Sequence, residues 1–210
     1  MDDKKLLVDC MTFEVSPEQI NESMKTNDGK LIVKGTLQRA EAKNQNGRIY
    51  PRDILMREAK KYTDIQIKER RALGELDHPD SSVVNLNNVS HNVKEMHWSG
   101  DDLVGTVEVL STPAGNILKE LFKNDIRLGI SSRGLGSVEP VNEASDTVAV
   151  QDDFELIAFD FVSNPSTHGA FLSPSKTNEG NLHEGVGTRN GTCCHDCKIE
   201  DIINDIFRGD

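Results

Sequence analysis

Short apolar runs of strand length recur through the chain and constrain its fold more than any other feature. Runs of this kind, bounded by turn-forming residues, are typical of β-strands. They occupy residues 31–37, 72–76, 83–98, 103–110, 128–132, 146–149 and 154–162. Residues 51–64 and the stretch that begins at Thr112 instead repeat apolar side chains at helical spacing. Many strands with two helices predict an α+β fold, mainly an antiparallel β-barrel surrounded by helices.

Turn residues and sequence proximity indicate how some of these strands are connected. Ser99-Gly100-Asp101-Asp102 predicts a hairpin turn between the two runs that flank it. The runs at 146–149 and 154–162 are neighbours in the sequence and are expected to pair. Residues 1–29 are polar with weak periodicity, so no helix or strand is predicted there.

The composition predicts one folded domain followed by a tail. The chain has 210 residues and a net charge of −11, and an acidic protein repels phosphate, which disfavours a nucleic-acid binder. No apolar run reaches the length of a signal peptide or a membrane span, so the protein is expected to stay where it is made. Gly, Asn and acidic residues become frequent from Ser173 onward. We therefore expect a domain over residues 1–172, with its core at about 30–165, and a flexible acidic tail over 173–210.

Three segments carry residue types suited to catalysis, and the first is Gly74-Glu75-Leu76-Asp77-His78-Pro79. His78 directly follows a predicted strand, and Pro79 restricts the backbone of the residue before it. A general base needs such a fixed position. The alternative interpretation is a surface turn that happens to contain a histidine.

The second segment, residues 129–137, is a strand with a serine on each face. Ser132 shares the face of two aliphatic residues, so Ser131 is predicted to point outward, between a glycine that leaves space and a cationic Arg133. A serine nucleophile needs that openness, and backbone N–H groups near Arg133 and Gly134 would bind the oxyanion. A bulge would exchange the two serines. A plain turn or a phosphate loop is the alternative, although neither common phosphate-loop pattern occurs.

The third segment is the apolar run at 154–162, which contains Asp160. A buried carboxylate is costly unless it is paired and hydrogen-bonded, and an imidazole is a suitable partner. The alternative is an aspartate that accepts hydrogen bonds from backbone N–H groups at a strand end.

Together these segments resemble the prohead core protein proteases of tailed bacteriophages, a family related in fold to the herpesvirus maturation protease, assemblin. The resemblance covers about residues 30–165 and includes the Asn-Gly-Arg-Ile-Tyr-Pro turn at 46–51. It implies an assemblin-like barrel and a serine endopeptidase that cleaves scaffold, core and capsid proteins. The expected location is the assembling prohead in the host cytoplasm. The resemblance implies neither a metal nor another cofactor.

The resemblance also assigns roles to residues. Ser131 would be the nucleophile, His78 the general base, and Asp160 the third member that orients the imidazole. The residues expected to support the oxyanion are Arg133, Gly134 and Ser132. Assemblin-type enzymes have a second histidine as the third member, so His168 stays open as the alternative to Asp160.

A preference for cleavage after Glu in Leu/Ile-Xaa-Glu is a further implication of the resemblance, and it predicts self-processing. Triplets of this form end at Glu22, Glu69, Glu75, Glu120 and Glu184. We expect cleavage after Glu184, in the tail, and after Glu22, because the other three lie in or beside predicted core elements.

Two alternatives of other classes stay open. A non-catalytic scaffold protein on the same fold would suit the acidic charge, although the presence of all three triad residues argues against it. The segment Cys193–Cys197 holds four soft-metal ligands, but a structural zinc site needs a second ligand pair, which is missing, so no metal is expected. The expected partners are protein substrates and neither nucleic acid nor a membrane, and a homo-oligomer is left open.

Overall fold

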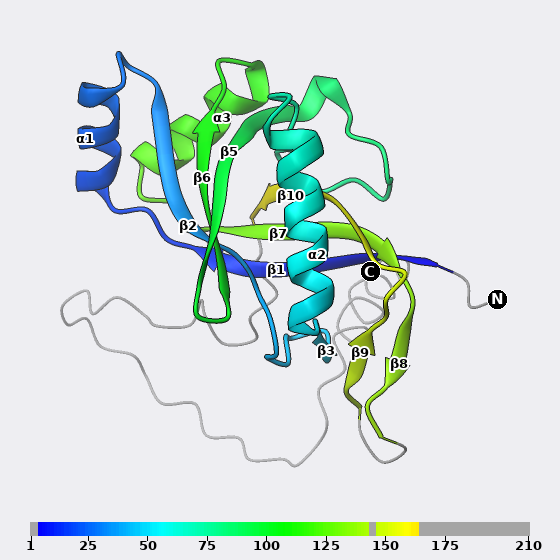
Figure 1. Ribbon diagram of the computed structural model, residues 1–210. Coiled ribbons are helices and arrows are strands. Elements are labelled where there is room, and N and C mark those ends of the chain that lie inside the picture. The colour runs from blue at the N-terminus through cyan, green and yellow to red at the C-terminus, as the bar shows by residue number, and fades with distance from the viewer. Residues whose placement is uncertain (1–3, 143–145, 164–210) are drawn as a thin grey trace, which may run out of the picture. The chain divides into compact units, whose positions relative to one another are not determined.

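The computed structural model describes residues 4–142 and 146–163, in which ten strands form three sheets (Figure 1). The first sheet is antiparallel and has the order β1 (Lys5–Phe13), β7 (Leu128–Gly136), β10 (Glu155–Val162). The second is antiparallel and has the order β2 (Leu31–Arg39), β6 (Asp102–Val109), β5 (Val89–Ser99), β4 (Leu73–Glu75). The third is small and has the order β3 (Arg48–Ile49), β9 (Val148–Val150), β8 (Val138–Pro140).

The two larger sheets approach each other along two edges. β1 lies beside β2, and β4 lies beside β10. At the second edge Leu76 and Phe161 form a single parallel bridge, and the Asp77 N–H donates to the Phe161 carbonyl at 2.7 Å. No ladder of hydrogen bonds closes the two sheets into one barrel within the described residues. The mixed α+β class is therefore confirmed, whereas the predicted closed barrel is not.

Aromatic side chains gather at one point of the core between these sheets. The ring of Phe161 on β10 makes edge-to-face contacts with Phe13, Phe122 and His91, at centroid distances of 5.1, 5.4 and 4.7 Å. Few aromatics are present in the chain, so most of the surrounding core is aliphatic, as the composition requires. The last strand is thus anchored by the side chains that flank Asp160.

Three α-helices flank the sheets in the described part of the chain: α1 (Pro17–Thr26), α2 (Arg52–Tyr62) and α3 (Pro113–Lys123). α2 and α3 confirm the two predicted helices, and a π-helical turn extends α2 over Thr63–Ile67. Thr112 caps α3, because its Oγ1 accepts from the Gly115 N–H at 3.0 Å. No helix among the described residues is long and apolar enough to cross a membrane.

The first 29 residues contain two elements that the sequence pattern did not predict. α1 begins with a capping box, in which Ser16 and Gln19 each accept a hydrogen bond from the other's backbone N–H. β1 alternates as a strand should, but one of its buried positions is Asp9. A carboxylate on the buried face hides the apolar alternation on which the prediction depends.

Two strand predictions are wrong. β9 pairs with β3 and β8, and β10 pairs with β7, so the expected pairing of 146–149 with 154–162 does not form. The strand at β7 continues to Gly136, and a Cβ on Gly134 would lie 2.4 Å from the Phe154 ring. Gly134 thus lets the start of β10 pack on β7, so β10 pairs with β7 instead of with the strand that precedes it in the sequence. Residues 83–88 form no strand and end in a short 3₁₀ turn, Leu86–Asn88.

Candidate active site

Ser131 lies in the middle strand of the first sheet, with a chemically distinct neighbour on either side. It is opposite Cys10 of β1 and Asp160 of β10. Directly opposed residues of an antiparallel pair project to the same face of a sheet. The strand register around Ser131 is regular, so it shares this face with Arg133, as the alternation predicted.

The predicted openness of this face is wrong for the structure, because Ser131 has an exposed fraction of 0%. One cause is a contact from the next residue on the same face. Arg133 donates from Nη1 to the Ser81 carbonyl at 2.6 Å and so holds residues 77–88 against this face. The Ser131 side chain is therefore closed to solvent in this structure.

The two adjacent serines differ in what their hydroxyls bind. Ser132 faces the other side of the sheet, where its Oγ accepts from Gln38 Nε2 at 2.7 Å and donates to the Asp9 carbonyl at 3.5 Å. The Oγ of Ser131 is buried and has no hydrogen-bond partner among the described residues. A hydroxyl without a partner needs an explanation in a folded protein, and a reactive role is one. Of the two hydroxyls, that of Ser131 is free of hydrogen bonds within the described residues, whereas that of Ser132 is occupied on the opposite face.

The Asn-Gly-Arg-Ile-Tyr-Pro turn fixes β1 from the opposite face. Asn46 Nδ2 and Arg48 Nη1 donate to Asp9 Oδ1 at 2.6 and 2.9 Å, and the Tyr50 hydroxyl donates to Asp9 Oδ2. Burial and the adjacent Asp9 carboxylate raise the pKa of Tyr50 well above its ordinary value, so its hydroxyl remains a donor. The turn thus satisfies the buried carboxylate of Asp9 and holds β1 against the strand that carries Ser131.

His78 follows β4 at the edge where β4 meets β10. Asp77, with a left-handed backbone at φ 67°, turns the chain there, and its Oδ1 accepts from the His78 N–H at 3.1 Å. The Asp77 N–H donates to the carbonyl of Phe161, the residue after Asp160, so His78 directly follows a contact with the strand that carries Asp160. The Nδ1 atom of His78 is buried without a hydrogen-bond partner in residues 4–142 and 146–163.

Asp160 is fully buried and paired, as predicted, but its observed partner is a guanidinium and not an imidazole. Arg133 Nε donates to Oδ2 at 2.8 Å, and Arg133 Nη2 donates to Oδ1 at 3.2 Å. The Glu75 N–H also donates to Oδ1, at 3.0 Å. No hydrogen bond joins His78 to Asp160 or to Ser131 in the part of the chain that the structure describes.

The predicted oxyanion donors lie next to an irregular part of the sheet. β10 has a bulge between Leu156 and Ala158, which are opposite Gly134 and Arg133. A bulge leaves one residue out of the ladder and is common beside active sites. The guanidinium of Arg133 is held by two carboxylates and a carbonyl. Arg133 and Gly134 lie in the middle strand and pair with both neighbours, and the residue that the bulge adds is Ile157 of β10.

A buried histidine, His91 on β5, contacts the backbone of β10 next to Asp160 and was not identified from the sequence. Its Nδ1 is 2.8 Å from Ser90 Oγ, and its Nε2 is 2.9 Å from the Phe159 carbonyl. A carbonyl accepts only, so Nε2 carries the proton and donates. Burial lowers the pKa of His91 to about 4, so the ring is neutral at pH 7. His91 lies within an apolar run, so the sequence gave no sign that it holds Phe159, the residue before Asp160.

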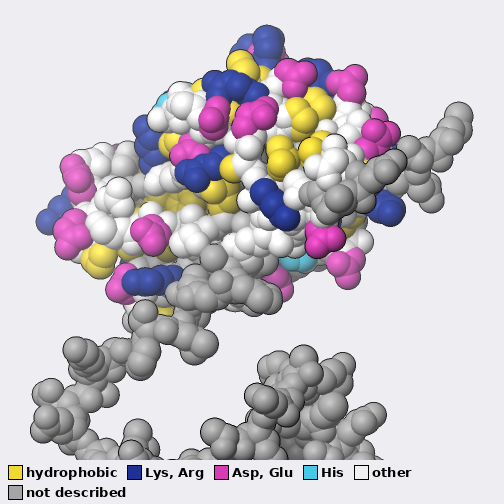
Figure 2. All heavy atoms as spheres, turned by 90° about the horizontal axis from the view of Figure 1, so that it is seen from below, with side chains coloured by type: hydrophobic (Ala, Val, Ile, Leu, Met, Phe, Trp, Pro, Cys, Tyr) yellow, Lys and Arg dark blue, Asp and Glu magenta, His cyan; other side chains and the backbone are white. Residues whose placement is uncertain are grey.

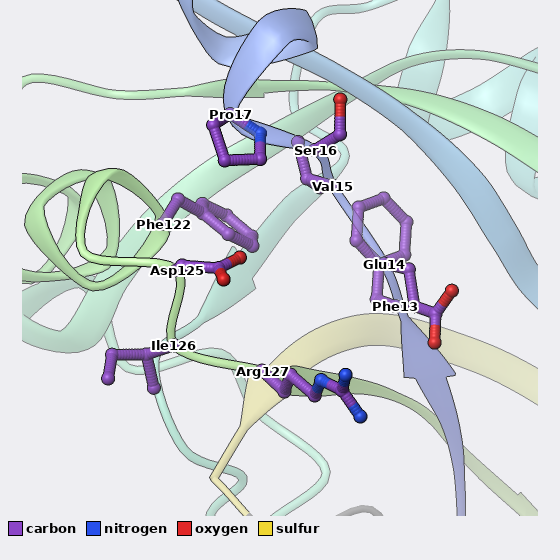
Figure 3. A pocket seen from close by; sticks show the side chains of 9 residues that line it. All are labelled: Phe13, Glu14, Val15, Ser16, Pro17, Phe122, Asp125, Ile126 and Arg127. Carbon is purple, nitrogen blue, oxygen red and sulfur yellow. The ribbon is translucent and has the colours of Figure 1, made fainter. Parts of the chain in front are cut away.

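Two cavities flank the first sheet. One, of about 320 Å³, is lined by Cys10 and by basic side chains that include Arg39 and Lys43. The other, of about 230 Å³, lies between the β1–α1 and α3–β7 connections; Figure 3 shows Phe122 on one side of it and Phe13 on the other. Neither is lined by a predicted triad residue, which agrees with the burial of Ser131.

The remaining predicted features divide into those that the structure describes and those that it does not. Glu22 is exposed but lies within α1, so cleavage there would require the helix to unfold. In the described residues no three His, Cys, Asp or Glu side chains lie close enough together to hold a metal ion. The surface drawn in Figure 2 interleaves acidic and basic side chains. The predictions that lie outside the described residues concern His168, Glu184, Cys193–Cys197 and the boundary at residue 172.

Comparison with known proteins identifies the family. A family model described as prohead core protein serine protease matches residues 9–182. The chain belongs to this family. This prohead protease is 32% identical over 171 residues to the prohead core protein protease of Enterobacteria phage T4, and the match covers 77% of this chain and 80% of the relative.

Structural comparison agrees with the family assignment. The solved structure of the bacteriophage T4 capsid assembly protease, gp21, matches this prohead protease with a TM-score of 0.67 and 26% identity. The match covers 78% of this chain and 100% of that one. These matches confirm the resemblance seen in the sequence motifs and support protease activity in capsid maturation, with the serine class implied by the family's description.

Proposed function

We propose that this prohead protease is a serine endopeptidase that cleaves scaffold, core and capsid proteins inside the assembling prohead. Ser131 is the nucleophile, His78 the general base and Asp160 the third member. The observation that carries this proposal is the buried hydroxyl of Ser131, which has no hydrogen-bond partner among the described residues and lies directly opposite Asp160. Two residues further along the same strand, Arg133 binds the segment that carries His78.

The proposed mechanism follows from these three groups. His78 accepts the proton of Ser131 as Oγ attacks the peptide carbonyl, and later donates it to the leaving amine. Asp160 accepts from the other imidazole nitrogen and so selects the tautomer in which the ring can take up the serine proton. Catalytic hydrogen bonds are often long or poorly aligned without substrate, so the imidazole completes these bonds when substrate binds.

The Asp160 carboxylate has one unused hydrogen-bond acceptor site for the imidazole. An ionised carboxylate offers about four acceptor sites. Three are used, two on Oδ1 by Glu75 N–H and Arg133 and one on Oδ2 by Arg133, which leaves a site on Oδ2. The unpartnered Nδ1 of His78 is the matching donor when protonated. His168 is the alternative third member.

The oxyanion is stabilised in this proposal by backbone N–H groups next to the β10 bulge, at Arg133 and Gly134. A donor of this kind is worth about 100–1,000-fold in turnover. The guanidinium of Arg133 contributes its positive charge from behind, because its N–H groups already serve Asp160, Glu75 and Ser81.

Specificity and self-processing are part of the same proposal. The enzyme cleaves after Glu in Leu/Ile-Xaa-Glu, and cleaves itself after Glu184, which lies in the Gly- and Asn-rich part of the sequence. The helical setting of Glu22 makes it the slower site.

Replacement of Ser131 tests the proposal against the non-catalytic scaffold alternative. Purified enzyme is incubated with the scaffold and capsid proteins of the same prohead, and cleavage products are measured by mass spectrometry. Ser131→Ala should abolish processing, while the control Ser132→Ala should keep it within about tenfold of wild type. Processing by Ser131→Ala at the wild-type rate would refute the protease assignment and favour the scaffold.

A further inference from the structure

We propose that Glu75 and Arg133 are positioning residues, whose buried ion pair clamps residues 77–88 to the first sheet and thereby fixes His78. This inference rests on the proposed function. It adds a role for Glu75, and it assigns the Arg133 side chain to the support of the general base.

The pair lies at the centre of a small set of contacts. Arg133 Nη2 is 3.2 Å from Glu75 Oε1, and neither side chain has any exposed surface. Each partner then holds a backbone group of the segment. Arg133 Nη1 donates to the Ser81 carbonyl at 2.6 Å, and Glu75 Oε1 accepts from the Asn85 N–H at 2.9 Å.

The segment has little else to hold its middle in place. Val83 and Leu86 are each 72% exposed, and the third large apolar side chain, Val84, is only partly buried. A stretch with few buried apolar contacts opens at low free-energy cost unless specific polar contacts fix it. The two hydrogen bonds from Glu75 and Arg133 supply such contacts, because the charged partner of each is a fully buried side chain.

The position of His78 depends on this segment. At the start of the segment, the Asp77 N–H donates to the Phe161 carbonyl at 2.7 Å. At its end, the Asn88 carbonyl accepts from the Leu76 N–H at 3.0 Å. His78 lies between the first anchor and the clamp. A misplacement of a catalytic group by about 1 Å costs on the order of 100-fold in rate, so loss of the clamp should lower turnover.

Of the two partners in the ion pair, Glu75 is the better residue to replace, because its removal leaves no unpaired buried charge. Arg133 also pairs with Asp160, so two buried carboxylates share one guanidinium, and Glu75 Oε2 has no partner among the described residues. Removal of Glu75 leaves a neutral Arg133–Asp160 pair. Removal of Arg133 would leave two unpaired buried carboxylates, which typically prevents folding.

The experiment combines two variants that break the same hydrogen bond from opposite sides. Glu75→Ala removes the acceptor, and Asn85→Pro removes the N–H donor and leaves the buried ion pair intact. The backbone φ of Asn85 is −85°, close to the value that proline requires. Asn85→Ala, which keeps the N–H, is the matched control, and Glu75→Gln, which keeps an acceptor oxygen, is the conservative rescue.

Two readouts are compared in full-length protein at a temperature well below the unfolding midpoint. The first is kcat and KM for processing, together with the rate at which a fluorophosphonate labels Ser131. The second is amide hydrogen exchange over residues 77–88. Glu75→Ala and Asn85→Pro should each lower kcat and the labelling rate about 10–100-fold, with KM within about threefold.

Exchange in the segment should be at least about tenfold faster in both variants, and the double variant should lose no more activity than either single one. Glu75→Gln should recover most of the activity and of the exchange protection that Glu75→Ala loses. Asn85→Ala should keep both close to the wild-type level. A purely structural role for Glu75 predicts lower thermal stability with kcat and exchange unchanged.

The outcomes separate this inference from the protease assignment. Wild-type labelling of Ser131 and wild-type exchange in Asn85→Pro would overturn the clamp, even if Ser131→Ala abolishes processing. If Ser131→Ala processes normally, the protease assignment fails, and the exchange measurement still decides whether Glu75 holds the segment. If Glu75→Ala does not fold, Asn85→Pro gives the answer alone.

Discussion

Ser131 and Asp160 are directly opposite each other across the β7–β10 ladder, with their side chains on the same face of the sheet. Ser131 has no hydrogen-bond partner in the described residues, whereas Asp160 accepts three hydrogen bonds, two of them from Arg133. The two groups therefore enter the reaction from different starting states. The serine is free to react, and the carboxylate is already fixed in place.

Asp160→Asn should lower turnover by about four orders of magnitude, because an asparagine stabilises the wrong imidazole tautomer. It also removes the ion pair between Asp160 and Arg133, so the unfolding midpoint should fall, while Glu75 still neutralises the guanidinium. Single-turnover kinetics and thermal unfolding measure the two effects. Asp102→Asn, at an exposed pair with Arg39, is the control. Near-normal turnover in Asp160→Asn would transfer the third position to His168 or to no residue.

A serine-directed covalent reagent should modify Ser131 and leave Ser132 unmodified, because the Ser132 hydroxyl is already bound to Gln38 and Asp9. Peptide mass spectrometry identifies the modified residue. Processing should continue in the presence of a chelator at millimolar concentration. Inhibition by the chelator, with normal activity in Ser131→Ala, would contradict a serine mechanism.

Stability should fall between pH 6.5 and pH 4 because of His91. Burial lowers its pKa from 6.5 to about 4, so the unfolded chain takes up a proton in this range before the folded protein does. The contribution is complete above pH 6.5 and is lost as the pH falls toward 4, by up to roughly 3 kcal/mol. Thermal unfolding of wild type and His91→Gln across this range measures the difference. Parallel curves for the two proteins would show that His91 does not titrate in this way.

Tyr50→Phe should destabilise the protein by about 1–2 kcal/mol, because it removes a hydrogen bond to the buried carboxylate of Asp9. Tyr62→Phe is the matched control. The Tyr62 hydroxyl is buried without a hydrogen-bond partner in the described residues, so its removal should be neutral within about 0.5 kcal/mol or stabilising. Denaturant unfolding gives both values. Equal losses in the two variants would mean that the Asp9 contact contributes nothing beyond packing.

Self-processing should remove residues 185–210 from active enzyme and leave Ser131→Ala intact. Intact-mass measurements over time follow the reaction, and Glu184→Gln should block this cleavage without lowering activity on other substrates. Persistence of the Cys193–Cys197 segment in fully active enzyme would contradict the prediction.

Local patterns predicted much of this fold. β2, α2, α3 and the β5–β6 hairpin follow from apolar periodicity and turn residues, which depend on nearby positions in the chain. The alternation at 128–132 also placed Ser131 and Ser132 on the correct opposite faces.

The errors concern interactions between residues distant in sequence. β1 was missed because Asp9 takes a buried position, and the residues that make this possible, Asn46, Arg48 and Tyr50, are about forty positions away. The pairing of Asp160 with Arg133 was missed because an arginine two residues after Ser131 gives no sign of the direction in which its guanidinium turns. Which groups meet in a buried ion pair depends on tertiary packing, and one sequence does not specify it.

The bridge between Leu76 and Phe161 is where the segment that carries His78 is attached to the sheet that carries Ser131. The proposed nucleophile therefore lies in one sheet and the proposed base follows a strand of the other, and each sheet can keep its own hydrogen bonds if the other shifts. A small slip between the sheets would separate the two reacting groups before any secondary structure is lost. On heating or in mild denaturant, the enzyme should become inactive while its circular dichroism is still that of the folded protein.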